Sequence, residues 1–207
     1  MSIDDLSRVR AMVGGTDFDA SKVNLALGEA GRWLRTTRWV HFQPFALAAF
    51  AEQGYSLDSR FDAPRTTTFP GVYSSPGKLW KPANYGGSSY GVQTVEEATW
   101  RSTNTVYAGI VDTVGPQQLV DMAHRLGVRS DLEPNYSLVL GSGEVSVLDM
   151  ASAYSTFAAR GRHTEPYVIT RVEDAVGNVL FDIADEVESE QVISEEVADT
   201  VTSALRG

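Results

Sequence analysis

Three consecutive helical patterns, each with its own start and stop signals, constrain the fold of this chain most. Thr94 is followed three residues later by Glu97, and Ser146 by Asp149 at the same spacing. A hydroxyl residue followed at this spacing by an acidic one is the capping-box pattern that opens a helix. A proline begins the second pattern and a glycine follows it, as helix ends prefer. The predicted helices cover 95–114, 116–126 and 146–160.

Extended patterns flank these helices on both sides. Residues 7–15 alternate like a strand and end in a Gly-Gly turn. Residues 167–172 and 178–181 are separated by a short glycine-containing turn, which indicates a β-hairpin. Strands near both ends with helices between them predict an α/β or α+β domain.

Two further helices and one long loop complete the expected organisation. An apolar stripe that begins at Pro44 and is stopped by Gly54 predicts a helix, and the acidic segment 193–205 predicts another. Prolines and glycines interrupt residues 58–93, so we expect a long loop there. Loops of this length often line a functional cleft.

Three aromatic residues of that loop are candidates for lining a substrate groove. They are Trp80, Tyr85 and Tyr90. The same residues could equally hold the loop against the core, and the sequence does not separate these two interpretations.

The composition excludes several classes of function. The 207 residues suit one domain or most of a larger one, and 43% of them are hydrophobic, which is enough for a core. A net charge of −10 argues against nucleic acid as a partner. The chain has no cysteine, so it has no disulfide, no thiolate metal site and no cysteine nucleophile. The isolated His124 and His163 have no metal-ligand spacing, and we expect no metal.

Short motifs along nearly the whole chain resemble one family. The matching positions are 9–15, 18, 24–26, 44–45, 48–49, 80, 82, 84–87, 91, 102–106, 140–141, 144–146, 153–154 and 157–158. Their order and spacing resemble the transpeptidase domain of penicillin-binding proteins, of the bifunctional class A type and of actinobacterial character. Sites of this family combine Ser-x-x-Lys, Ser-x-Asn and Lys-Thr-Gly motifs.

The resemblance implies a fold, a reaction and a set of site residues. The fold would be α+β, like serine β-lactamases, with a helical subdomain packed on an antiparallel sheet. Ser102 and Asn104 would form the second motif, in which the serine helps to move a proton and the asparagine amide orients the substrate peptide. The implied reaction is D,D-transpeptidation through a serine acyl-enzyme, without a cofactor. Its partners would be peptidoglycan stem peptides and β-lactams.

The resemblance also implies that residues 1–207 are part of a larger protein. We expect this chain to lack an upstream glycosyltransferase domain and membrane anchor, and the downstream strand that carries Lys-Thr-Gly. The fold would therefore be incomplete. The parent protein would act at the extracytoplasmic face of the bacterial membrane, although we recognise no signal or membrane segment in this chain.

The first motif departs from the family. Phe42, Pro44 and Phe45 hold the register of Gly-Ser-Thr-Phe-Lys-Pro-Phe, which places Val40 at the nucleophile position and Gln43 at the lysine position. Valine has no nucleophilic atom, and a neutral amide cannot accept the nucleophile's proton. We therefore predict that this chain is inactive, and that it forms no covalent adduct with penicillin.

Three explanations of this departure stay open. The chain could be a pseudoenzyme that binds or organises cell-wall partners without catalysis, or it could use His41, although no carboxylate lies beside that histidine in sequence. The third explanation is a reading-frame change over 33–43. Codons permitted by this segment, read one base later and with one base restored at the end, give Gly-Ser-Gly-Arg-Pro-Gly-Gly-Ser-Thr-Phe-Lys. That product contains an intact first motif.

Overall fold

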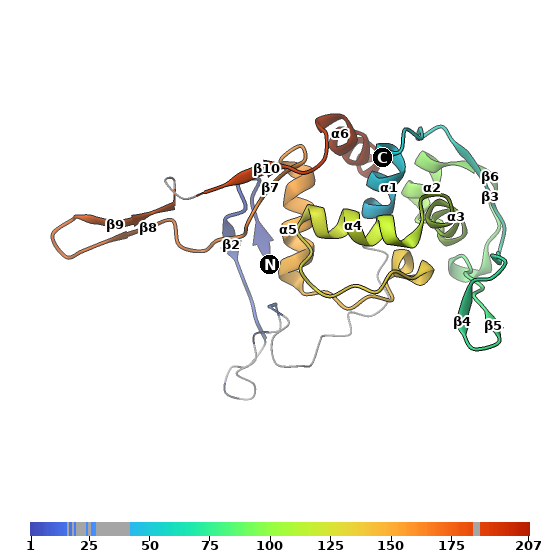
Figure 1. Cartoon of the computed structure of the whole chain (residues 1–207), viewed down its shortest axis with the longest axis horizontal. Helices are drawn as coiled ribbons and strands as arrows, with labels where there is room; N and C mark the ends of the chain where they lie inside the picture. The colour runs from blue at the N-terminus through green and yellow to red at the C-terminus, as the bar shows by residue number, and fades with distance from the viewer. Residues whose placement is uncertain (16, 18, 20–23, 25, 28–41, 184–186) are drawn as a thin grey trace. The chain divides into compact units, whose positions relative to one another are not determined.

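The computed structural model of the chain divides into two compact units, which are described separately here. It describes residues 1–15, 17, 19, 24, 26–27, 42–183 and 187–207. The first unit comprises 1–34, 125–130 and 145–195, and the second comprises 35–124, 131–144 and 196–207. Helices and antiparallel strand pairs occur together, which confirms the α+β class (Figure 1).

Helices form the core of the second unit. Helix α1 (Gln43–Glu52) packs against α3 (Asn104–Val114), and α2 (Val95–Arg101) lies directly before α3. Residues 43–50 of α1 are all buried, which fits a central helix rather than an amphipathic surface helix. The predicted helix after Pro44 is therefore confirmed. The core of this unit includes five side chains from α1 and α3 that are each at most 1% exposed: Phe45, Leu47, Phe50, Tyr107 and Ile110.

Two more helices match their predicted positions closely. Helix α4 (Pro116–Leu126) has the predicted bounds, and α6 (Glu195–Arg206) lies within two residues of them. Both are strongly amphipathic, and α6 buries an apolar stripe at three- and four-residue spacing. This periodicity explains why the sequence alone located them.

The expectation of a structureless loop over 58–93 was wrong. Strand β3 (Arg60–Ala63) pairs antiparallel with β6 (Gly91–Thr94), and β4 (Tyr73–Ser75) pairs with β5 (Lys78–Leu79). These strands have two to four residues, too few for a readable alternation. A 3₁₀ turn at Tyr85–Gly87 lies between β5 and β6 in sequence.

Helix α5 and the terminal strands build the first unit. Helix α5 (Val147–Ala158) contacts the short strands β1 (Ser2–Ile3) and β7 (Arg162–Thr164). Strand β1 pairs with β2 (Val9–Ala11), and β7 pairs with β10 (Ser189–Gln191), both antiparallel. The hairpin of β8 (Arg171–Glu173) and β9 (Val179–Asp182) extends away from α5 in Figure 1 and confirms the predicted hairpin.

Both predicted capping boxes are present. The Thr94 hydroxyl accepts from the Glu97 backbone N–H at 3.1 Å, and the Glu97 carboxylate accepts from the Thr94 N–H at 2.9 Å. At α5, the Ser146 hydroxyl accepts from the Asp149 N–H at 2.9 Å. The buried Asp149 carboxylate also accepts from the Ser130 hydroxyl, so this cap anchors a second chain segment.

The prediction of one continuous helix over 95–114 was wrong, because the chain turns at Ser102. Ser102 has left-handed backbone angles (φ 51°, ψ 50°), and Thr103 is extended before α3 begins. The buried Thr103 hydroxyl donates to the Gln93 side-chain oxygen at 2.9 Å and fixes the break. Glycine usually occupies a left-handed helix end, so a serine there gave no signal.

We predict that Ser102→Gly is more stable than Ser102→Ala by about 1 kcal/mol, because glycine adopts positive φ without strain. Both variants lose the hydroxyl, so their difference isolates the backbone. Arg101, the last residue of α2, provides the control. The Arg101→Gly variant should be less stable than Arg101→Ala by about 1 kcal/mol. Urea unfolding of the four variants measures both differences, and the same order at both positions would contradict the assignment.

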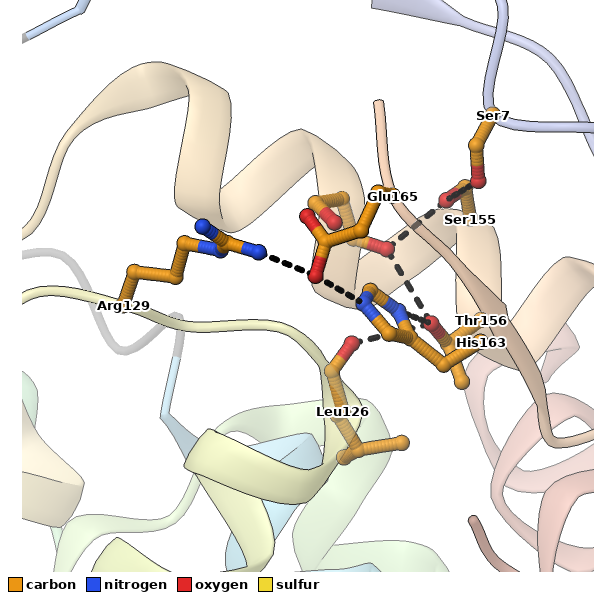
Figure 2. A network of polar contacts seen from close by, with 8 residues as sticks. Ser7, Leu126, Arg129, Ser155, Thr156, His163 and Glu165 are labelled. Atoms are coloured by element: carbon orange, nitrogen blue, oxygen red, sulfur yellow. Dashed lines mark hydrogen bonds and ion pairs between the residues drawn. The ribbon is translucent and has the colours of Figure 1, made fainter. Parts of the chain in front are cut away.

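A buried polar network joins α5 to β7 and to the end of α4 within the first unit (Figure 2). The Thr156 hydroxyl donates to the Leu126 carbonyl at 2.9 Å and lies 3.0 Å from His163 Nδ1. The Thr156 hydroxyl also donates to the Ser152 carbonyl at 3.3 Å, and the tautomer of His163 sets which atom donates in its contact with Thr156. His163 Nε2 lies 3.5 Å from Glu165, which also pairs with Arg129. Thr156 is 1% exposed, so its hydroxyl has a structural role in joining these segments.

We predict that Thr156→Val lowers the free energy of unfolding by about 1–3 kcal/mol, because it leaves a buried carbonyl and the His163 ring without their partner. Thr113→Val is the matched control, since the Thr113 hydroxyl is exposed and bonds only within its own helix. The control should change stability by less than about 0.5 kcal/mol. Equal effects in thermal or urea unfolding would show that the network contributes nothing specific.

Candidate functional site

The left-handed turn at Ser102 brings its hydroxyl to the first residue of α1. Ser102 Oγ donates to Gln43 Oε1 at 3.0 Å, although the two residues are 59 positions apart. Gln43 is 5% exposed and Ser102 is half-buried. The structure therefore joins the predicted second-motif serine to the residue at the predicted lysine position.

The other half of the Gln43 amide lacks a partner. Gln43 Nε2 is buried and makes no hydrogen bond to any described residue. Buried polar groups are normally paired, and an unpaired donor costs about 1–3 kcal/mol. At this position only the oxygen of the Gln43 amide is hydrogen-bonded, and the amide offers no basic atom to Ser102.

Asn104 begins α3 two residues after Ser102. Its Nδ2 donates to the Ala83 carbonyl at 2.8 Å, and the side chain is half-buried. This contact fixes the asparagine amide against the segment that follows β5. Ser102 and Asn104 thus lie at the adjoining ends of α2 and α3.

Asn84 is a structural residue of the site that the sequence analysis did not single out. It is 5% exposed, its Nδ2 donates to the carbonyls of Pro64 and Ser88, and its Oδ1 accepts from the Thr105 N–H at 3.0 Å. Asn84 therefore ties the loop to the first turn of α3. The sequence does not signal this role, because the Asn84 partners Pro64 and Thr105 lie 20 and 21 positions away.

The three aromatic candidates differ in their surroundings, and their role in a substrate groove stays a prediction. Trp80 is 8% exposed and stacks on Phe69 with ring centroids 5.8 Å apart. Tyr85 is 94% exposed, and the Tyr90 ring lies under the Arg101 guanidinium at 5.6 Å. Trp80 lines an open pocket to which neither tyrosine contributes.

Part of the first motif lies outside the described residues. Val40 and His41 belong to the segment 28–41, so the proposed nucleophile position and the His41 alternative both stay predictions. Phe42, which directly precedes α1, is 2% exposed and meets the Phe45 ring edge-on at 5.3 Å. The aromatic residues that fix the register of the motif are therefore core residues.

The described residues contain neither a metal-binding cluster nor a helix that could span a membrane. No group of three or more histidine, aspartate or glutamate side chains in the described ranges could hold a metal ion. In the same part of the chain, no helix combines the length and the apolar character needed to cross a membrane.

Known proteins match this chain in both sequence and structure. The family model "Penicillin binding protein transpeptidase domain" matches residues 43–207. Penicillin-binding protein 1A of Mycolicibacterium smegmatis is 32% identical over 96% of this chain, and that of Mycobacterium tuberculosis is 34% identical over 95%. This chain spans about a quarter of the length of those two relatives (25% and 24%).

Solved structures of penicillin-binding proteins also match this chain. The M. tuberculosis protein PonA1, solved in complex with penicillin V, superimposes with a TM-score of 0.81 at 33% identity. The match covers 98% of this chain and 53% of the solved PonA1 chain. Penicillin-binding protein 1A of Haemophilus influenzae gives a TM-score of 0.78 at 26% identity, covering 93% of this chain and 32% of that one. The family match over residues 43–207, with relatives above 30% identity along nearly the whole chain, shows that this chain belongs to the penicillin-binding protein transpeptidase family.

Proposed function

We propose that Gln43, Ser102 and Asn104 form a D,D-transpeptidase-type site that binds cell-wall stem peptides but makes no acyl-enzyme. The observation that carries this proposal is the 3.0 Å hydrogen bond from Ser102 Oγ to Gln43 Oε1. It brings together two residues that the family register assigns to two different catalytic motifs. The Asn104 amide lies two residues further on, at the start of α3.

The chemistry of the substituted residues supports inactivity. Acyl transfer needs a nucleophile and a group that removes its proton. Val40 supplies no nucleophilic atom, and the Gln43 amide is not basic at neutral pH. Ser102 donates its own proton to Gln43, so in this arrangement it has no base that would activate it.

We also propose that the parent protein of this chain is an enzyme of cell-wall synthesis. Residues 1–207 form part of its transpeptidase domain, and the parent acts at the extracytoplasmic face of the membrane. β-Lactams are the second proposed ligand class, because PonA1, 33% identical to this chain, was solved with penicillin V. In this chain the β-lactam would bind without covalent attachment.

A reading-frame change over 33–43 is a second proposal. It is favoured by two observations: the family match begins at Gln43, and Gln43 Nε2 is buried without a partner among the described residues. Both observations fit a position 43 whose surroundings suit a side chain other than glutamine. The coding DNA decides between the proposals, because only certain codons over 33–43 permit the alternative frame.

We predict that the purified chain gains no mass on incubation with fluorescent penicillin, because position 40 has no nucleophile. Intact-mass spectrometry and in-gel fluorescence measure the adduct, and active PonA1 serves as the positive control. Gln43→Lys alone should also stay unlabelled, since it restores a base but no nucleophile. A stoichiometric adduct on the unmodified chain would refute the inactive assignment.

We also predict that Asn104→Ala weakens binding of a blocked acyl-D-Ala-D-Ala peptide by about threefold to tenfold, as the loss of one hydrogen bond implies. Asn178→Ala is the control, because Asn178 belongs to the β8–β9 turn in the other unit. Isothermal titration measures both variants after circular dichroism has shown that they are folded. No binding by the unmodified chain, or equal weakening by both variants, would contradict a retained peptide site.

A further inference from the structure

The second unit contains an open pocket that the proposed acyl-transfer site does not use. It has a volume of about 670 Å³ and lies between the turn that precedes β4 and the 3₁₀ turn η2 (Tyr136–Leu140). Its lining includes Tyr73, Trp80, Asn135, Tyr136 and Ser137. A volume of this size is typical of small-ligand sites. Gln43, Ser102 and Asn104 are not among its lining residues.

Two aromatic residues of the lining, Trp80 and Tyr136, form a wall of this pocket and are held in place by the neighbouring Phe69. Phe69 stacks on Trp80 at 5.8 Å and on Tyr136 at 6.3 Å, with ring planes within 28° of parallel in both pairs. Burial and the Asp112 carboxylate raise the pKa of Tyr136. The Tyr136 ring is held by its stacking on Phe69.

Tyr73 is the third aromatic residue that lines the pocket, beside Trp80 and Tyr136, and it is the most accessible one. It lies on β4 and is 59% exposed, although aromatic side chains normally bury most of their surface. An exposed ring beside a stacked cluster offers a flat apolar surface to a ligand. Tyr73 is therefore the residue on which ligand contact depends most.

The polar wall of the pocket is rich in groups that both donate and accept. The Ser137 hydroxyl donates to Asn135 Oδ1 at 2.7 Å, and the Ser142 hydroxyl lies 2.9 Å from Ser137 Oγ. Asn135 Nδ2 has two protons and makes one hydrogen bond, to the Glu133 carbonyl at 3.3 Å. Unused hydroxyl lone pairs and an amide proton are therefore available to a ligand.

No charged side chain lines this pocket among the described residues, although the chain carries a net charge of −10. A carboxylate, phosphate or ammonium ligand would find no opposite charge in the lining. The ligand that fits is uncharged, with one flat apolar face and an edge of mixed donors and acceptors. A pyranose ring has this chemistry, because its C–H groups form a face and its hydroxyl or acetamido groups form the edge.

We propose that this pocket binds a neutral sugar ring, with the ring face on Tyr73 and its polar substituents toward Asn135 and Ser137. This inference goes beyond the acyl-transfer assignment, because the two sites share no residue. A neutral peptide could also offer donors and acceptors. A peptide strand gains most from pairing with a strand edge, whereas the aromatic wall favours a flat ring.

The test is titration of the full chain with the uncharged trimer of N-acetylglucosamine, followed by saturation-transfer difference NMR and calorimetry. We expect weak binding that Tyr73→Ala reduces by about threefold to tenfold, as the loss of one aromatic contact implies. Tyr73→Phe should retain the affinity within about twofold, because the ring supplies the contact. Tyr85→Ala is the matched control, since Tyr85 is 94% exposed and lies outside the pocket.

Each outcome decides the proposal. Binding that depends on Tyr73 and not on Tyr85 supports it. No saturation transfer to the sugar at millimolar concentration, or equal losses in the two alanine variants, would overturn it. A blocked neutral peptide that binds through Tyr73 while the sugar does not would assign the pocket to peptides instead. Because the probe contains no D-Ala-D-Ala and no β-lactam, a negative result here leaves the proposed acyl-transfer site untouched.

Discussion

The proposed site depends on the hydrogen bond from Ser102 to Gln43. That bond in turn depends on the strained backbone of Ser102. Ser102 takes left-handed backbone angles, ends α2 and directs its hydroxyl to α1. Left-handed angles are unfavourable for a non-glycine residue, so the surrounding structure must hold them. The Thr103–Gln93 bond and the Asn84 contacts to the start of α3 supply that support. A strained residue held in this way beside a buried amide is typical of a functional position.

In the proposed function, the scaffold of the transpeptidase-type site is intact and only its chemistry is changed. Phe42 and Phe45 are fully packed, and Asn84 and Asn104 fasten the loop before α3 to the helix. Within the proposed site, Gln43 Nε2 is a buried polar atom without a partner, and Ser152 Oγ in the first unit is another among the described residues. In the proposed function, the unpaired amide fits a position that evolved around another side chain, which accords with a family match that begins at Gln43.

Elements with long periodic patterns could be predicted from the sequence, and irregular ones could not. The proline start and amphipathic stripe of 116–126 located α4 to the residue, and both capping boxes formed as expected. The break at Ser102 was missed because left-handed geometry is set there by tertiary contacts and not by a glycine. The two-residue strand β5 was missed because it is shorter than any readable alternation. The family resemblance located the Ser102–Gln43 pair, whereas the anchoring role of Asn84 and the aromatic pocket around Tyr136 needed coordinates.

A crystal structure of this chain soaked with penicillin V would test the central claim most directly. The account predicts that Ser102 Oγ stays about 3.0 Å from Gln43 Oε1 and that no side chain carries a bond to the drug. Continuous electron density from a side chain to an opened β-lactam ring, or Ser102 and Gln43 on separate surfaces, would contradict it.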